Sequence, residues 1–438
     1  MCTSYAHFSL SLICTPRAPS EVENAPSQFT IDITAQAAAT NPIIPIPTYL
    51  PTSWYPTYSP INGWGDSSPT PPGDLFLLSG QSNIIGHSTS RQSIGKNNDY
   101  WLEIKSILEA AKNNDESKEE MEEELNAVIE RTNNLPRCLL GCKTKNAVLS
   151  NLQSQSNTAQ DENDELKKCK QGCRNVASTL TSELLKLYNL GLLSNIDEPL
   201  THGKCSFVEP IKDKGNGVEY ISQGTVPINW NVGCGKAFGS EFMFGRTLEM
   251  GTTDNNSTST SMTTTYTSNF ELVKNGRGGS ELYKHWYPNH GLYWNELQKT
   301  ISQRKGQDNN WKALIWHQGE NDAFVDDSST YYLGNLTTFV NAVRMEMYDS
   351  SEVSTWQCKE EIPTIIIQLG HWPTGEDGDS IRDAQATFCD EDIGRSILVT
   401  TNDLSHNYHY DAASFLVIGY RIALAYEEVM KRNITCPY

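Results

Sequence analysis

Short runs of apolar residues are the feature that most constrains how this 438-residue chain can fold. A strand that is apolar on both faces has to be covered on both faces, so such runs predict the inner strands of a parallel sheet. Helical patterns at about 329–349, 380–389 and 412–431 alternate with them. This alternation predicts an α/β sheet with helices on both faces. The runs cover 75–78, 313–316, 364–368 and 397–400, and a further strand is expected at 270–273.

Two parts of the chain lie outside this alternation. Residues 1–73 are rich in Pro, Thr and Ser, which predicts an extended stalk or linker, because proline at that density prevents regular helix. Residues 92–215 separate the first strand from the others and contain helical patterns. We therefore expect one α/β domain formed by 74–91 and 216–438, interrupted by a helical, cysteine-containing insertion at 92–215.

The insertion contains two pairs of cysteines at i,i+4 spacing, which places both thiols of a pair on one helical face. Two antiparallel helices of this kind can be joined by the disulfides Cys138–Cys173 and Cys142–Cys169. A zinc site made by the same four thiolates is the alternative, although structural zinc more often uses CxxC spacing. Free thiols in the native protein would exclude the disulfides.

The charge balance and the cysteine content limit the possible partners and location. The 34 Lys and Arg against 53 Asp and Glu give a formal charge of −19, which disfavours binding to nucleic acid or to an anionic membrane surface. No apolar run reaches the roughly 18 residues needed to span a bilayer. The 11 cysteines and the sequons at Asn255, Asn256, Asn335 and Asn433 favour a secretory route. The signal peptide is weak, because no Lys or Arg precedes the apolar stretch 8–14.

Polar motifs follow three of the expected strands. GQSNIIG (80–86) places Ser82 in a strand-to-helix turn, IWHQGEND (315–322) supplies an amide and carboxylates, and NDLSHNYHYDAAS (402–414) supplies His406 and His409. Each motif alone is compatible with an ordinary helix cap. The carboxyl ends of parallel strands meet at one edge of a sheet, where α/β folds bind ligands, so together the motifs predict a serine-based catalytic site.

These motifs resemble those of the SGNH hydrolase superfamily, and within it the sialate O-acetylesterase and acetylxylan esterase group, carbohydrate esterase family 6. Further similar stretches are GSEFMFGR (239–246), LVKNGRGGSEL (272–282) and IRDAQ (381–385). The resemblance covers roughly 74–90 and 225–432, and it leaves out the stalk and the insertion. It implies a three-layer, flavodoxin-like parallel sheet.

The resemblance also implies roles for individual residues. Ser82 would be the nucleophile, and His409 the general base, because Gly419 follows it at the group's spacing of ten residues. The oxyanion would be held by the backbone N–H groups of Ser82 and Gly239 and by the side chain of Gln318. These donors would stabilise the negative charge of the transition state.

The acid of the triad is left open between several carboxylates. His406 occupies the place, three residues before His409, where many members of the superfamily have an aspartate. We expect Glu320 to orient His409, with Asp403 and Asp411 in reserve. A second register pairs Asp403 with His406 as the base.

The function expected from the resemblance is hydrolysis of acetyl esters on carbohydrates through an acetyl-enzyme, without a metal or an organic cofactor. A general SGNH lipase or thioesterase, and a secreted carbohydrate-binding protein on a decayed hydrolase fold, are the alternatives. Some aromatic residues near the motifs would stack on sugar rings or pack in the core: Trp286, Trp316, Trp372 and Tyr410. The partner of the insertion, if it has one, stays open.

Overall fold

The structure is a computed structural model, and the described residues all lie in the second of two compact units, which span 1–61 and 62–438. The predicted stalk lies outside the described residues, apart from Gly73 at its end. The structure describes residues 73–86, 103–104, 106–107, 110, 118–132, 159–193, 196, 198–212, 218–222, 226–228, 234, 239–251, 268–304, 310–325, 327–350, 361–371, 376–392, 394–404 and 409–432.

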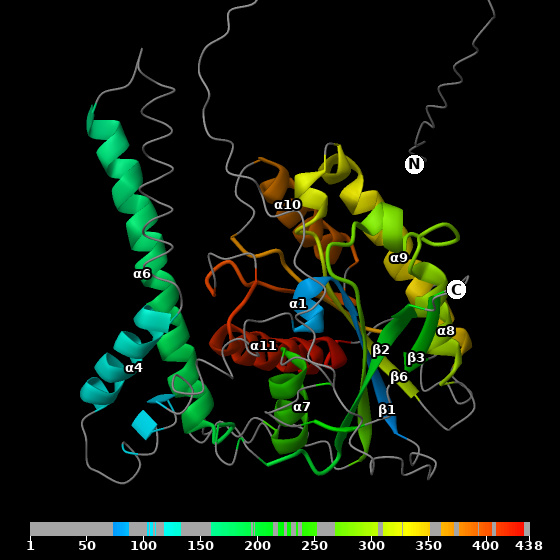
Figure 1. The fold of residues 1–438 in the computed structure, drawn as a ribbon, viewed down its shortest axis with the longest axis horizontal. Coiled ribbons are helices and arrows are strands. Elements are labelled where there is room, and N and C mark those ends of the chain that lie inside the picture. Colours follow the sequence, from blue (N-terminus) through cyan, green and yellow to red (C-terminus); the bar gives the residue numbers. More distant parts are fainter. Residues whose placement is uncertain are drawn as a thin grey trace, which may run out of the picture. The chain divides into compact units, whose positions relative to one another are not determined.

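A parallel sheet forms the centre of the fold (Figure 1). Five strands lie in the order β5-β1-β6-β7-β8, which is the 2-1-3-4-5 order of flavodoxin-like folds. β2 (Gly203–Lys212) pairs in parallel with β5 and makes a sixth parallel strand, while β3 (Val218–Ser222) and β4 (Val226–Pro227) pair with β2 antiparallel. The predicted α/β class and all five predicted strands are confirmed. These strands are β1 (Asp74–Gly80), β5 (Phe270–Gly276), β6 (Asn310–His317), β7 (Thr364–Ile367) and β8 (Ser396–Val399).

Two hydrophobic cores lie on opposite faces of the sheet, because alternate residues of β1 point to opposite sides. Phe76 and Leu78 belong to the core under α7 (Glu241–Met250) and α11 (Ala412–Met430). Leu75 and Leu77 belong to the other core. That second core is covered by the short helix η2 (Leu282–Trp286), α8 (Trp294–Ser302), α9 (Ser328–Asp349) and α10 (Glu376–Glu391).

Helices α7 and α11 pack tightly because of a glycine. A Cβ atom at Gly419 would overlap the carbonyl oxygen of Ser240 and crowd the backbone nitrogen of Phe244. The glycine ten residues after His409 therefore allows the C-terminal helix to approach α7 closely. This packing helps to place the start of α11, where His409 lies, against the sheet.

The boundary that we expected between insertion and sheet at residue 215 is wrong, because residues 203–212 form β2 and belong to the sheet. The strand escaped sequence analysis because it lacks an apolar run, contains Pro210 and lies beyond β5 near the edge of the sheet. A disulfide between Cys205 of β2 and Cys234 fixes this strand to the segment that precedes α7. The rest of the predicted domain division stays a prediction.

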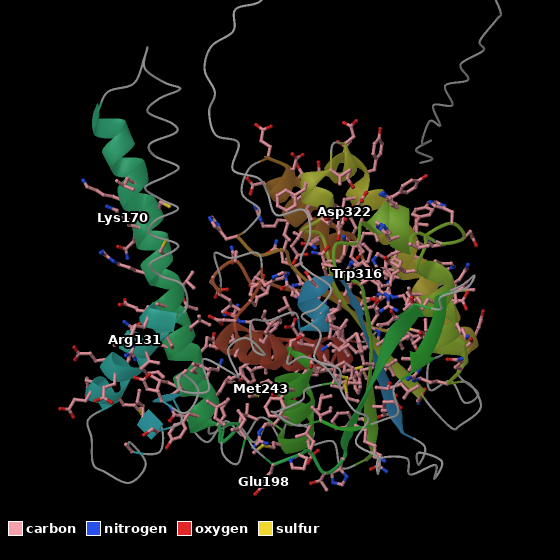
Figure 2. All side chains as sticks on the ribbon, in the orientation of Figure 1. Arg131, Lys170, Glu198, Met243, Trp316 and Asp322 are labelled. Carbon is pink, nitrogen blue, oxygen red and sulfur yellow. A yellow bond between two sulfur atoms is a disulfide. The ribbon has the colours of Figure 1, made fainter. Side chains whose placement is uncertain are left out.

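The insertion contributes two helices, α4 (Lys118–Thr132) and α6 (Ala159–Asn189), which pack against each other (Figure 1). Figure 2 marks Arg131 on α4 and Lys170 on α6. Cys169 and Cys173 are both disulfide-bonded. Cys138 and Cys142 lie outside the described residues, so the predicted pairing stays a prediction. The contact between the helices is mainly apolar, with one hydrogen bond from the Thr181 hydroxyl to Asn126 at 3.2 Å. Its buried apolar residues are Leu125, Val128 and Ile129 on α4 and Val176, Leu180 and Leu184 on α6.

Within the described ranges, no helix combines the length and the apolar character that crossing a bilayer requires.

Candidate active site

Ser82 lies at the carboxyl end of β1, as the first residue of the short helix α1 (Ser82–Ile85). The turn before it depends on Gly80, whose φ of +143° disfavours a side chain and whose Cβ atom would overlap the His317 carbonyl. The N–H of Gln81 donates to the same carbonyl oxygen at 3.0 Å. Ser82 is therefore held in a buried, tightly constrained turn beside β6.

His409 lies directly against Ser82. Its Nε2 atom is 3.0 Å from the hydroxyl oxygen of Ser82, although 327 residues separate the two. The hydroxyl of Tyr410 is 2.6 Å from that of Thr401, and Asp411 accepts a hydrogen bond from the N–H of Ser414 at 2.8 Å to cap α11. The half-buried histidine is thus flanked by residues that are anchored to β8 and α11. The structure brings together the two predicted residues in the geometry of a nucleophile and its base.

The structure does not place Glu320 on His409. The buried Glu320 accepts a hydrogen bond from Nδ2 of Asn83 at 2.5 Å, and its Oε1 is 3.9 Å from Nε2 of His317. Within the described residues, no hydrogen bond joins Glu320 to His409. Glu320 instead follows β6 into the protein interior and holds α1 through Asn83, the residue next to Ser82, and its role as the orienting acid stays a prediction.

Burial is the main cause of the pKa shifts of Glu320 and His317. It raises the pKa of Glu320 to about 7, a shift that hydrogen bonds from its own backbone and from Asn83 lessen. It lowers the pKa of His317 to about 3, so this histidine is neutral at physiological pH. The structure buries His317 at the end of β6.

The two reserve acids are also engaged away from His409. Both carboxylate oxygens of Asp403 accept hydrogen bonds from Arg421, at 2.8 and 2.7 Å. Asp411 is the cap of α11. His406, the alternative base, lies outside the described residues, so the second register stays a prediction. Among the described residues, no carboxylate that we considered hydrogen-bonds His409.

Two of the three predicted oxyanion donors already have acceptors. The side-chain amide of Gln318 donates to the carbonyl of Ser280 at 2.9 Å and to Asp322, while its oxygen accepts from Tyr332. The N–H of Gly239 donates to Glu241 at 3.1 Å. The oxyanion roles expected for Gln318 and Gly239 therefore stay predictions. Gln318 lies under the turn that contains Ser280, where burial requires its amide to be satisfied within the protein.

Sequence reasoning missed that this turn is the backbone segment beside Ser82. A Cβ atom on Gly278 would lie 3.9 Å from Cβ of Ser82, and both Gly278 and Gly279 are exposed. In the described part of the chain, no acceptor takes the backbone N–H groups of Ser82, Gly278 or Gly279. Consecutive glycines at the end of a strand were the available signal, since they mark close backbone approach.

Side-chain hydrogen bonds hold the Gly278–Gly279 turn in place. The hydroxyl of Ser280 donates to the carbonyl of Arg277 at 2.8 Å, and the indole N–H of Trp286 donates to that hydroxyl at 2.8 Å. Asp322 accepts from Gln318, and its burial raises its pKa to about 6. Trp316 and Asp322, labelled in Figure 2, mark β6 and the turn that follows it.

Most of the aromatic residues that we considered for sugar stacking belong to the core. Trp286, Trp316 and Tyr410 are buried, and the rings of Trp286 and Trp316 pack edge to face. Trp372 lies outside the described residues. In the described ranges, no group of three or more His, Cys, Asp or Glu side chains has a metal-binding arrangement.

Residues 227–428 match the family model described as carbohydrate esterase, sialic acid-specific acetylesterase. No curated protein matches the chain. Several solved structures are similar to it at low identity. A protein from Arabidopsis thaliana is 18% identical, with 54% of this chain and 84% of that chain covered and a TM-score of 0.38. NanS is 14% identical, with 55% of this chain and 91% of that chain covered and a TM-score of 0.37. A carbohydrate acetylesterase from Xanthomonas citri is 16% identical, with 54% of this chain and 54% of that chain covered and a TM-score of 0.33.

The family match includes β5, β6, β7, β8 and most of α11, and thus the segments that carry Gly278, Gln318 and His409. Ser82 lies before it in the sequence, and the sheet brings this residue to the same edge. Residues 227–428 are therefore similar to the carbohydrate esterases of the sialic acid-specific acetylesterase family.

Proposed function

We propose that the protein is a carbohydrate O-acetylesterase that removes acetyl groups from sugar hydroxyls through an acetyl-enzyme on Ser82. The 3.0 Å contact between the Ser82 hydroxyl and Nε2 of His409 carries this proposal, because a serine hydroxyl needs an adjacent base to become a nucleophile. The family match indicates the class of substrate.

In the proposed reaction, His409 takes the proton of the Ser82 hydroxyl as the oxygen attacks the ester carbonyl. The protonated His409 then gives this proton to the departing sugar oxygen, which leaves the acetyl group on Ser82. His409 next takes a proton from a water molecule, which attacks the acetyl-enzyme, and returns that proton to Ser82 as acetate leaves.

We assign the oxyanion to backbone donors. Gly278 of the Gly278–Gly279 turn lies next to Ser82, and the N–H groups of Ser82, Gly278 and Gly279 have no acceptor among the described residues. Gln318 acts indirectly by holding Ser280, and Glu320 by holding Asn83. One well-placed oxyanion donor contributes about 3 to 4 kcal/mol to transition-state stabilisation.

The decisive assay is acetate release from acetylated xylan and from O-acetyl sialic acid by wild type, Ser82→Ala and His409→Ala. We expect activity on at least one substrate, and its loss in both variants. Ser302→Ala, a serine on the exposed end of α8, is the matched control and should retain full activity. Unchanged activity in Ser82→Ala would exclude the proposed nucleophile, and unchanged activity in His409→Ala would exclude the proposed base.

Two further measurements separate the alternatives. Preference for long acyl chains over acetyl would identify a lipase or thioesterase. An organophosphate should label Ser82, and a protein that only binds carbohydrate would not be labelled.

We also propose that the protein follows the secretory route. The Cys205–Cys234 disulfide and the disulfide-bonded Cys169 and Cys173 support this, because such bonds persist in oxidising compartments. Expression in a eukaryotic secretory system followed by endoglycosidase treatment should lower the apparent mass. A mass that does not change would remove the sequons as support.

A further inference from the structure

Arg421 of α11 lies at the junction of three separate parts of the fold. It donates to the carbonyl of Thr400, at the end of β8, at 2.9 Å, and to both oxygens of Asp403. It also donates to Glu183 of the insertion helix α6 at 3.3 Å. Burial lowers the pKa of this guanidinium, but the bonds and charges of Asp403 and Glu183 outweigh that effect and raise it. Arg421 is therefore a charged link between the sheet, the insertion and the segment after β8.

That segment carries the proposed base. We call residues 400–404 and 409–411 the histidine segment. Further hydrogen bonds hold the described part of this segment. The hydroxyl of Ser414 donates to the carbonyl of Leu404 at 2.9 Å and its N–H to Asp411 at 2.8 Å, while the hydroxyl of Thr401 donates to the carbonyl of Gln368 at 2.8 Å and contacts Tyr410. Arg421 is the contact that neutralises the charge of Asp403 in this segment.

Two charged residues of α6, one helical turn apart, contact α11 beside the apolar core that the two helices share. Glu183 reaches Arg421, and the ammonium group of Lys186 lies 5.0 Å from the ring centroid of Tyr420. The Glu183 contact continues to the histidine segment through Arg421, whereas Lys186 packs on the ring of Tyr420. The two residues therefore form a matched pair for testing what the insertion does.

We propose that Arg421 is a positioning residue for His409, and that Glu183 makes the helical insertion part of this support. The inference rests on the proposed function. The bidentate pair with Asp403 and the bond to Thr400 fix the course of the histidine segment, and Glu183 fixes the orientation of the guanidinium. The insertion then acts on the reaction through the placement of the base, without touching the substrate.

The first test is kinetic, with the full chain and the acetyl substrate that gives the higher rate. Arg421→Met should lower kcat by about tenfold to 100-fold, since small displacements of a catalytic group have effects of that size. KM should stay within about twofold, because the residue does not face the substrate. Arg421→Lys, which keeps the charge and one donor, should recover part of the loss.

The matched controls separate positioning from general packing. Arg432 lies at the end of the same helix and donates to the carbonyl of Ser396 at 3.4 Å and to Glu428. Arg432→Met should leave kcat unchanged. In the insertion, Glu183→Gln should lower kcat by about threefold or more, and Lys186→Met should not. Equal losses in the two members of either pair would overturn the inference.

The second test does not depend on activity. Hydrogen exchange of peptides that contain residues 400–404 should be faster in Arg421→Met than in wild type and unchanged in Arg432→Met. If Arg421→Met does not fold, Asp403→Asn provides the same comparison from the other side of the pair. If the exchange rate of these peptides is the same in Arg421→Met and wild type, the positioning role is overturned. This result does not depend on whether Ser82→Ala supports or contradicts the proposed reaction. Loss of activity in Ser82→Ala with full activity in Arg421→Met overturns this inference alone.

Discussion

The buried carboxyl group of Glu320 should make the stability of this domain depend on pH in a way that one substitution can reveal. Burial raises its pKa from 4.5 to about 7 in the folded protein. Between these values the folded state holds the proton more tightly than the unfolded state, so the free energy of unfolding falls as pH rises. The contribution is fully present below about pH 4.5 and is lost above about pH 7.

The size of the effect follows from the two pKa values. A rise from 4.5 to about 7 corresponds to about 3 kcal/mol at 25 °C, and Glu320 is fully buried, so solvent screening does not reduce it much. Glu320→Gln removes the ionisable group and keeps an oxygen for Asn83. The variant should therefore be more stable than wild type by about 3 kcal/mol at pH 8, and nearly equal to it at pH 4.5.

The assay is urea unfolding of both proteins followed by circular dichroism at pH 4.5, 6, 7 and 8. Other titrating groups, Asp322 among them, are common to both proteins and largely cancel in the difference. Ser302→Ala, which changes no ionisable group on the exposed end of α8, is the control and should give a difference from wild type that does not change with pH. A difference for Glu320→Gln that is the same at pH 4.5 and pH 8, or that favours wild type at pH 8, would refute the reasoning.

Three further outcomes are expected. Gly278→Val should lower kcat/KM for acetyl esters about tenfold or more, because its methyl groups occupy the exposed space beside Ser82, while the melting temperature stays within a few degrees. Retained kcat/KM would remove the turn from the site. Gly80→Ala should lower the free energy of unfolding by about 2 kcal/mol or more in thermal unfolding, whereas Gly334→Ala, in open space on α9, should raise it by about 0.5 to 1 kcal/mol. The reverse order of these two stabilities would contradict the steric argument. Replacing Cys205 and Cys234 together with Ala should lower the free energy of unfolding by about 2 to 4 kcal/mol. A smaller loss would mean that the disulfide is not needed to hold the strand β2 in place.

The positions of Ser82 and His409 could be predicted from the sequence because each follows an element with a strong local signal. An apolar strand precedes Ser82, and a long apolar helix with a glycine at a set distance follows His409. Parallel strands bring their carboxyl ends to one edge, so residues far apart in the chain were expected to meet there. The 3.0 Å contact agrees with that expectation.

The partners of polar side chains could not be predicted in the same way. Gln318 and Glu320 were placed at the correct edge of the sheet, but their side chains turn toward Ser280 and Asn83. Motif spacing says which groups are near each other along the chain. It does not say which buried donor lacks an acceptor, and that requirement decides where a buried amide or carboxylate points.

The sequence by itself indicated the five inner strands, three of the helices that cover them, and the meeting of Ser82 with the segment of His409 at one edge of the sheet, because apolar periodicity and backbone direction are local properties. Only the tertiary structure decided that β2 joins the sheet, that the Gly278–Gly279 turn lies beside Ser82, and that Arg421 connects the insertion to the histidine segment. These are contacts between segments far apart in the chain. Their energies depend on burial and on satisfying every buried polar group, which no single segment of the sequence specifies.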